Sequence, residues 1–120
     1  MKLTDKELEV MRVIWNSKRP LCVPEIITAS KNRTWRLSSI YNIVRSLSAK
    51  KVVEIIHDKP TTTNTAKFVR PIISIDEYVT MQVLDLSPDD IESVFHAIVK
   101  NEKYSKSAKN ILSRVIDSLD

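Results

Sequence analysis

The stretch from Trp35 to Arg70 reads WRLSSIYNIVRSLSAKKVVEIIHDKPTTTNTAKFVR, and its pattern decides the expected fold. Its first half places apolar residues at helical spacing, so that they share one face, which must be buried. These residues are Ile40, Ile43, Val44 and Leu47. The opposite face carries hydrogen-bonding side chains and no carboxylate. We therefore expect an amphipathic helix over about residues 38–50 whose outer face is available for binding.

Two runs rich in β-branched residues follow this helix, VVEIIH and AKFVRPII. Between them lies a polar tip that contains Pro60, where a missing backbone amide costs little. Pro71 marks where the second strand should stop. The order helix, strand, tip, strand is that of a winged helix with its wing over residues 57–67. The pattern therefore predicts a DNA-binding module with the helix 38–50 as its recognition helix.

The residues before this stretch predict two supporting helices. Thr4 can cap the first helix, and Glu7 can complete a capping box with it. The expected buried stripe of this helix is Leu8, Met11, Ile14 and Trp15. A second short helix begins near Pro24, a residue suited to the first helical position. Trp35 is also expected in the core.

Three more helices are expected after residue 72. The helix over 75–86 is apolar on nearly all sides, and helices that begin at Ser87 and Ser105 carry apolar stripes. A second copy of the chain is the economical cover for so much apolar surface, giving a two-fold dimer. The fold class is thus mainly α with a small β-wing: a winged helix-turn-helix domain over 1–72 and a helical dimerisation region over 73–120. The expected dimer interface comprises Tyr78, Met81, Leu84, Phe95, Ile111, Leu112, Val115, Ile116 and Leu119.

Charge is divided unequally along the 120 residues. Residues 1–70 carry 14 Lys/Arg and 6 Asp/Glu, a net charge of +8, whereas residues 71–120 carry 5 and 9, a net charge of −4. Positive charge gathered on the module with the recognition helix is expected of a protein that binds phosphates.

Composition also excludes several classes of protein. Cys22 is the single cysteine, so the chain has no internal disulfide and no thiolate cluster for a metal, and it has no glycine for a phosphate-binding loop. We expect no cofactor, no metal and no small-molecule ligand. No apolar run approaches the ~20 residues that span a bilayer and no leader opens the chain, so a soluble cytoplasmic protein without a membrane partner is expected. Two distant histidines and no apparent serine–base pair argue against an enzyme.

The expected partner is double-stranded DNA. Asn42 and Arg45 are the main candidates for base contacts, because Asn suits adenine and Arg suits guanine in the major groove. Ser39 and Ser46 complete the expected base-contacting set. The expected backbone contacts are Lys31, Arg33, Arg36, Tyr41, Lys50, Lys59 and Lys67. The rival interpretation is a winged-helix module that binds other proteins and no specific DNA sequence, with little dependence on salt.

Three segments resemble a known family. The opening LTDKELEVMRVIW is similar to that family's first helix, and WRLSSIYNIVRSL is similar to its tryptophan-led recognition-helix signature. The three-helix tail matches its dimerisation region in length and pattern. The chain thus resembles, over essentially its whole length, the penicillinase-repressor family, which includes the methicillin-resistance and copper-responsive repressors of bacteria. The resemblance implies an N-terminal winged helix, a C-terminal dimer and repression by occupying a (pseudo)palindromic promoter operator.

The chain departs from this family on the groove face of the recognition helix. Family members tend to have threonine at the positions of Ser38, Ser39 and Asn42. They usually have arginine at Ser46, one place after Arg45. The family's operator sequence is therefore not expected to carry over.

Other departures concern the family's switches. The Cys-x-Cys tail of copper-responsive members has no counterpart, and Ala97-Ile98 stands where β-lactam-responsive members are cleaved at an Asn-Phe bond. Neither switch is expected. The glycine usual before the first wing strand is replaced around Lys51, where the turn should differ.

Overall fold

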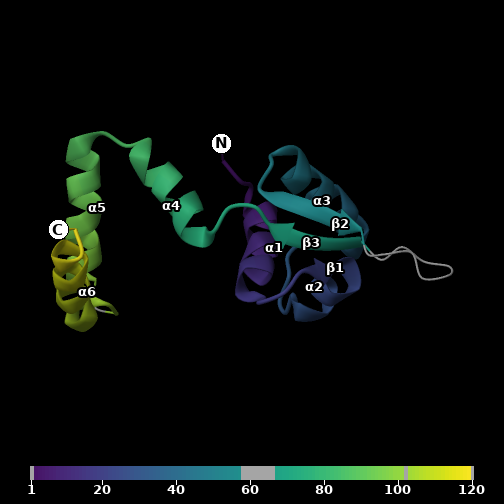
Figure 1. Cartoon of the computed structure of the whole chain (residues 1–120), viewed down its shortest axis with the longest axis horizontal. Coiled ribbons are helices and arrows are strands. Elements are labelled where there is room, and N and C mark those ends of the chain that lie inside the picture. Colours follow the sequence, from purple (N-terminus) through teal and green to yellow (C-terminus); the bar gives the residue numbers. More distant parts are fainter. Residues whose placement is uncertain (1, 58–66, 102, 120) are drawn as a thin grey trace. The chain divides into compact units, whose positions relative to one another are not determined.

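The computed structural model describes residues 2–57, 67–101 and 103–119, and it divides into two compact units, Met1–Tyr78 and Val79–Asp120. Each unit is described by itself (Figure 1). Within the described residues the fold is mainly helical with a small three-stranded sheet, which confirms the expected winged-helix class. The elements are α1 (Asp5–Asn16), β1 (Leu21–Cys22), α2 (Val23–Ala29), α3 (Ile40–Ala49), β2 (Val53–His57), β3 (Lys67–Pro71), α4 (Ile75–Leu84), α5 (Pro88–Lys100) and α6 (Ser105–Asp117).

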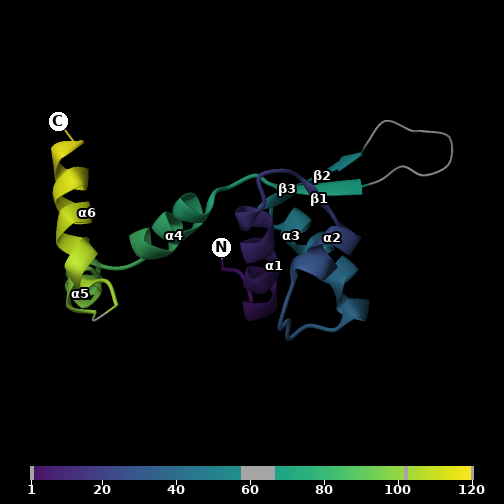
Figure 2. The same cartoon turned by 90° about the horizontal axis from the view of Figure 1, so that it is seen from below.

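The sheet of the first unit is antiparallel, with strand order β1-β3-β2. β2 pairs with β3 from Val53 opposite Pro71 to His57 opposite Lys67, so these strands form the two sides of the wing. β3 ends at Pro71 as expected. The two-residue β1, which the sequence did not predict, pairs Leu21 with Val69. Figure 2 shows α1, α2 and α3 together on one face of the sheet.

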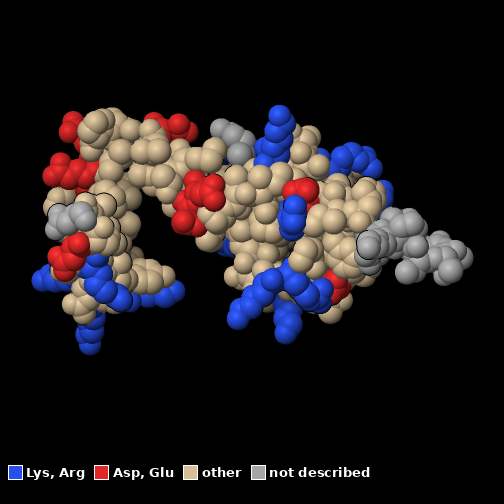
Figure 3. Space-filling model, in the orientation of Figure 1, with Lys and Arg blue, Asp and Glu red and all other residues tan. Residues whose placement is uncertain are grey.

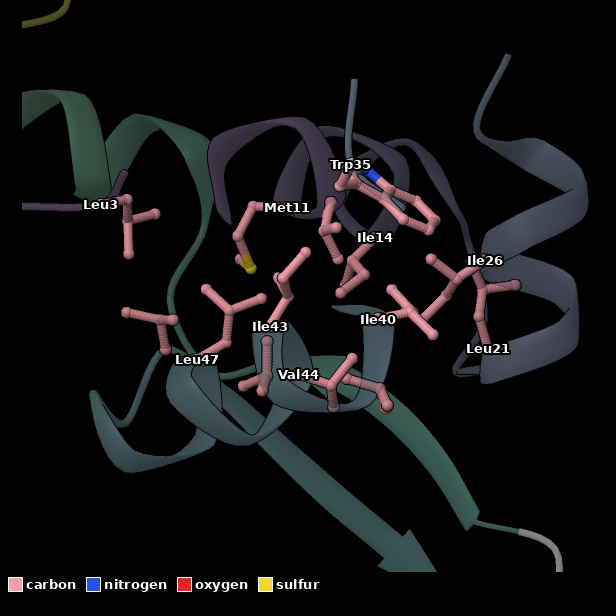
Figure 4. Close-up of a cluster of buried hydrophobic side chains, with 14 of the residues drawn as sticks. Leu3, Met11, Ile14, Leu21, Ile26, Trp35, Ile40, Ile43, Val44 and Leu47 are labelled. Atoms are coloured by element: carbon pink, nitrogen blue, oxygen red, sulfur yellow. The ribbon is translucent and has the colours of Figure 1, made fainter. Parts of the chain in front are cut away.

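The core of the first unit lies between these helices and the sheet. Met11 and Ile14 of α1 face Ile43 and Ile40 of α3 (Figure 4). Trp35, just before α3, is only 3% exposed, so its expected place in the core is confirmed. The apolar face predicted for the recognition helix is likewise buried in full: Ile40, Ile43, Val44 and Leu47.

α1 begins as the sequence predicts, because Thr4 and Glu7 form a capping box. Its buried face differs from the expected stripe. Val10 and Glu7 are buried, whereas Leu8 and Trp15 are only partly buried against the core. The Trp15 side chain lies at the edge of the core, and its indole N–H donates a hydrogen bond to the Ile73 carbonyl oxygen at 2.9 Å.

Tyr78, which we expected at a dimer interface, is instead part of the core of the first unit. Its ring lies against Trp15, with ring centroids 5.8 Å apart, and its hydroxyl oxygen accepts a hydrogen bond from the backbone N–H of Leu3 at 3.3 Å. The sequence pattern did not show this, because α4 is apolar on nearly all sides and only the contact with Trp15 of α1 distinguishes Tyr78 from its exposed neighbours.

In the turn after α3, Lys51 stands where the family usually has a glycine. The helix ends at Ala49 with Lys50 as its C-cap, and Lys51 adopts a left-handed backbone with φ of 62°. Glycine is the residue that adopts this conformation without a steric penalty, so Lys51 carries local backbone strain. The strained turn lets the chain leave α3 and enter β2 at once.

The second unit contains α5 and α6, which pack on each other and leave large apolar side chains exposed. Of the residues expected at the dimer interface, Leu112 is half-buried and the following are exposed: Met81, Leu84, Phe95, Ile111, Val115, Ile116 and Leu119. Leu119 has the largest exposed fraction among them, 77%. Among the helices that the structure describes, none combines the length and the apolar character that crossing a membrane requires.

Candidate DNA-binding interface

The outer face of α3 is built from side chains that can form hydrogen bonds. Asn42 and Arg45 are exposed one helical turn apart, and Arg45 Nη1 donates to Asn42 Oδ1 at 3.4 Å. Tyr41 beside them is 62% exposed. Ser39, in the single 3₁₀ turn Leu37–Ser39 that precedes α3, is half-buried. The helix therefore presents an amide and a guanidinium together.

A small groove brings the recognition helix and the wing together. It has a volume of about 150 Å³, and its floor is apolar. Tyr41 and Arg45 of α3 line it on one side, and Lys67 at the start of β3 lines it on the other. Two cations and a phenol thus surround one groove, although they come from elements more than 20 residues apart in the sequence. Lys59 and the rest of the wing tip lie outside the described residues.

The turn before α3 carries three of the expected phosphate contacts. Lys31, Arg33 and Arg36 are all exposed. The loop is held from below, because Glu9 of α1 accepts hydrogen bonds from both the backbone N–H and the hydroxyl of Thr34. Figure 3 shows Lys and Arg side chains spread over one face of this unit.

Trp35 anchors the same loop from inside the core. The Arg33 guanidinium lies 5.4 Å from the centre of the Trp35 ring. The buried indole N–H of Trp35 has no hydrogen-bond partner within the described part of the chain. An anchored loop of this kind can present its cations without a large loss of backbone entropy.

Ser46 and Lys50 have partners inside the protein. The Ser46 hydroxyl donates to Glu7 Oε2 at 2.7 Å, and Lys50 Nζ donates to Glu7 Oε1 at 2.5 Å. Both side chains are half-buried. The helical spacing that pointed to DNA contacts at these positions left out α1, whose first turn lies beside the last turn of α3.

The electrostatics of Glu7 follow from its surroundings. Burial raises the pKa of its carboxyl group, but hydrogen bonds from Lys50, from the Thr4 backbone and from Ser46 outweigh burial. The net effect lowers the pKa from 4.5 to about 2. Glu7 is therefore ionised in the folded protein, and its charge is matched by Lys50.

The comparison with protein families decides the identity of this architecture. A sequence model described as Penicillinase repressor matches residues 3–118. The chain belongs to the penicillinase repressor family. No curated protein matches the chain closely enough to serve as a relative. The family is one of transcriptional repressors, so the outer face of α3, the groove and the turn before α3 are the parts of this repressor-family chain to consider for binding.

Two features of this repressor-family chain were missed from the sequence. Leu37, just before α3, is apolar yet 51% exposed. The sequence did not predict this exposure, because Leu37 fits the apolar stripe of the helix. The link from Glu7 to Lys50 was missed because the two residues lie 43 positions apart. Among the described residues, no group of three His, Cys, Asp or Glu side chains is placed to hold a metal ion.

Proposed function

We propose that this chain is a DNA-binding transcriptional repressor that occupies a (pseudo)palindromic promoter operator as a homodimer. The observation that carries the proposal is the exposed pair Asn42 and Arg45 on a helix with no outward carboxylate, next to the cationic groove that Lys67 completes. In this arrangement α3 enters the major groove and the wing, residues 57–67, follows the backbone.

Base recognition falls to the outer face of α3. Asn42 is assigned to adenine and Arg45 to guanine, because each can form two hydrogen bonds to the major-groove edge of that base. Ser39 is assigned to a neighbouring base or phosphate. Ser46 and Lys50 are left out of the contact set because both already donate to Glu7.

Backbone contacts position the helix in the groove. Lys31, Arg33 and Arg36 flank α3 on its N-terminal side, and Tyr41 and Lys67 flank it on the wing side. Lys59, at the wing tip, is proposed as a further phosphate contact. These side chains contribute affinity that falls with salt and carries no sequence information.

The dimer is proposed from the apolar surface of the second unit. Phe95 of α5 is 51% exposed, and Ile111 and Val115 of α6 are 48% and 49% exposed. Exposed apolar side chains in such number mark an association surface rather than a solvated one. A two-fold pair of chains would place its recognition helices on half-sites about one or more DNA turns apart.

A gel shift across a salt series tests the proposal, with the promoter region upstream of the chain's own gene and an unrelated fragment of equal length. We expect selective binding whose logarithmic affinity falls by about 0.9 per phosphate contact and per decade of salt. Weak binding that is equal for both fragments and insensitive to salt would contradict the proposal and favour a protein-binding module.

A further inference from the structure

Glu7 places a buried negative charge next to the recognition helix, and DNA binding by itself does not require a carboxylate there. It lies on α1, is only 3% exposed, and is ionised beneath the recognition helix. Burying a charge costs free energy unless partners compensate for it. The partners of Glu7 therefore indicate what the charge does.

These partners join the first turn of α1 to the last turns of α3. Oε1 of Glu7 accepts hydrogen bonds from the Thr4 backbone N–H at 2.9 Å and from Lys50 Nζ at 2.5 Å. Its Oε2 accepts from the Ser46 hydroxyl at 2.7 Å. Lys50 Nζ also donates to the carbonyl oxygen of Lys2 at 3.3 Å. Both ends of the link are thus fixed, one in the N-terminal cap of α1 and the other at Ser46 of α3 and at Lys50, the C-cap of α3.

We propose that Glu7 is a positioning residue for operator recognition: it holds α3 on α1 through Ser46 and Lys50, so that Asn42 and Arg45 meet base edges in the correct alignment. The proposal rests on the proposed function. Arg45 precedes Ser46 directly, so any rotation of α3 that follows the loss of this link displaces Arg45 as well.

The link should affect base recognition more than phosphate binding. A bidentate hydrogen bond to a base requires a fixed direction and distance. A lysine or arginine contact to phosphate tolerates displacement, because it is mainly a charge interaction. Since Lys50 is held by Glu7, its charge is also kept away from the DNA backbone, which limits sequence-independent binding.

Glu7→Gln tests this division, with Glu54→Gln as the matched control. Glu54 is also paired with a cation, Arg70, at 3.0 Å, but both side chains are exposed and face each other across neighbouring strands. Both substitutions remove one negative charge and release one paired cation, Lys50 or Arg70, so their effects on non-specific DNA affinity should be similar. The measurement is the ratio of operator affinity to non-specific affinity at fixed salt, with protein concentrations corrected for the active fraction.

We expect Glu7→Gln to lower this ratio about tenfold or more, the discrimination of one bidentate base contact, and Glu54→Gln to leave it unchanged. A purely structural role would lower the active fraction and leave the ratio unaltered. Equal ratios for the two variants would overturn the proposal.

Substitutions at Lys50 keep the test decisive if Glu7→Gln fails to fold. Lys50→Arg retains a cation for Glu7 and should keep the ratio within about threefold, whereas Lys50→Met should lower it about tenfold. If Lys50 is a phosphate contact instead, Lys50→Met weakens operator and non-specific binding equally and the proposal is overturned. Failure of the proposed function is distinguishable, because the wild-type chain would then show no selectivity at all.

Discussion

Lowering the pH should reduce the free energy of unfolding of the first unit, because it protonates Glu7. The folded protein holds the pKa of Glu7 at about 2, against 4.5 when the group is free of its partners. Because the folded pKa is the lower one, the stabilisation is present above pH 4.5 and is lost as the pH falls toward 2. At ~1.36 kcal/mol per unit, the full contribution is on the order of 3 kcal/mol.

The assay is urea unfolding of the wild-type chain and of Glu7→Gln at a series of pH values between 7 and 2.5, followed by tryptophan fluorescence. Both tryptophans, Trp15 and Trp35, belong to the first unit, so the signal reports on that unit. Glu9 and Glu25 also have lowered pKa values, because Thr34 hydrogen-bonds the first and Arg19 the second. These groups are common to both proteins and cancel in the difference.

We expect the wild-type chain to be more stable than Glu7→Gln by about 3 kcal/mol at pH 7, and the two stabilities to converge below pH 4. A difference that stays constant over the whole pH range would refute the assignment of the charge to Glu7. A difference near zero at pH 7 would show that burial offsets the hydrogen bonds completely.

Three further predictions concern recognition, the turn after α3 and assembly. Arg45→Ala should lose about 1–3 kcal/mol of discrimination at one base pair of each half-site, whereas Lys67→Ala should weaken all sequences alike and reduce the salt slope by about one; footprint titrations on operator variants separate the two effects. Lys51→Gly should raise the free energy of unfolding by about 1 kcal/mol, because glycine relieves the left-handed backbone there, and an unchanged urea midpoint would speak against strain. Val115→Asp should shift sedimentation toward the monomer, while Asn110→Asp, which adds the same charge on the opposite side of α6, should not; equal behaviour would place the dimer elsewhere.

The parts of the fold that the sequence predicted are those fixed by local patterns. Thr4 and Glu7 lie within one helical turn, and the apolar spacing of α3 fixes its buried face whatever packs against it. The exposure of Asn42 and Arg45 follows from the same spacing.

The parts that were missed depend on contacts between distant segments. Periodicity places Ser46 and Lys50 near the outer face of α3, but α1 approaches from that side and engages them. Tyr78 fits an apolar helix on any side, and its contacts with Trp15 and with Leu3, 75 residues away, show what covers it. β1 has two residues, too few for an alternating pattern.

Selection of bound fragments from a random pool of DNA duplexes tests the central claim most directly. We expect the wild-type chain to enrich one dyad-symmetric sequence with half-sites about 10 base pairs, or a multiple, apart, and Arg45→Ala to lose preference at a single guanine of each half-site. Enrichment of no sequence, or of a sequence that Arg45→Ala selects unchanged, would contradict recognition through α3.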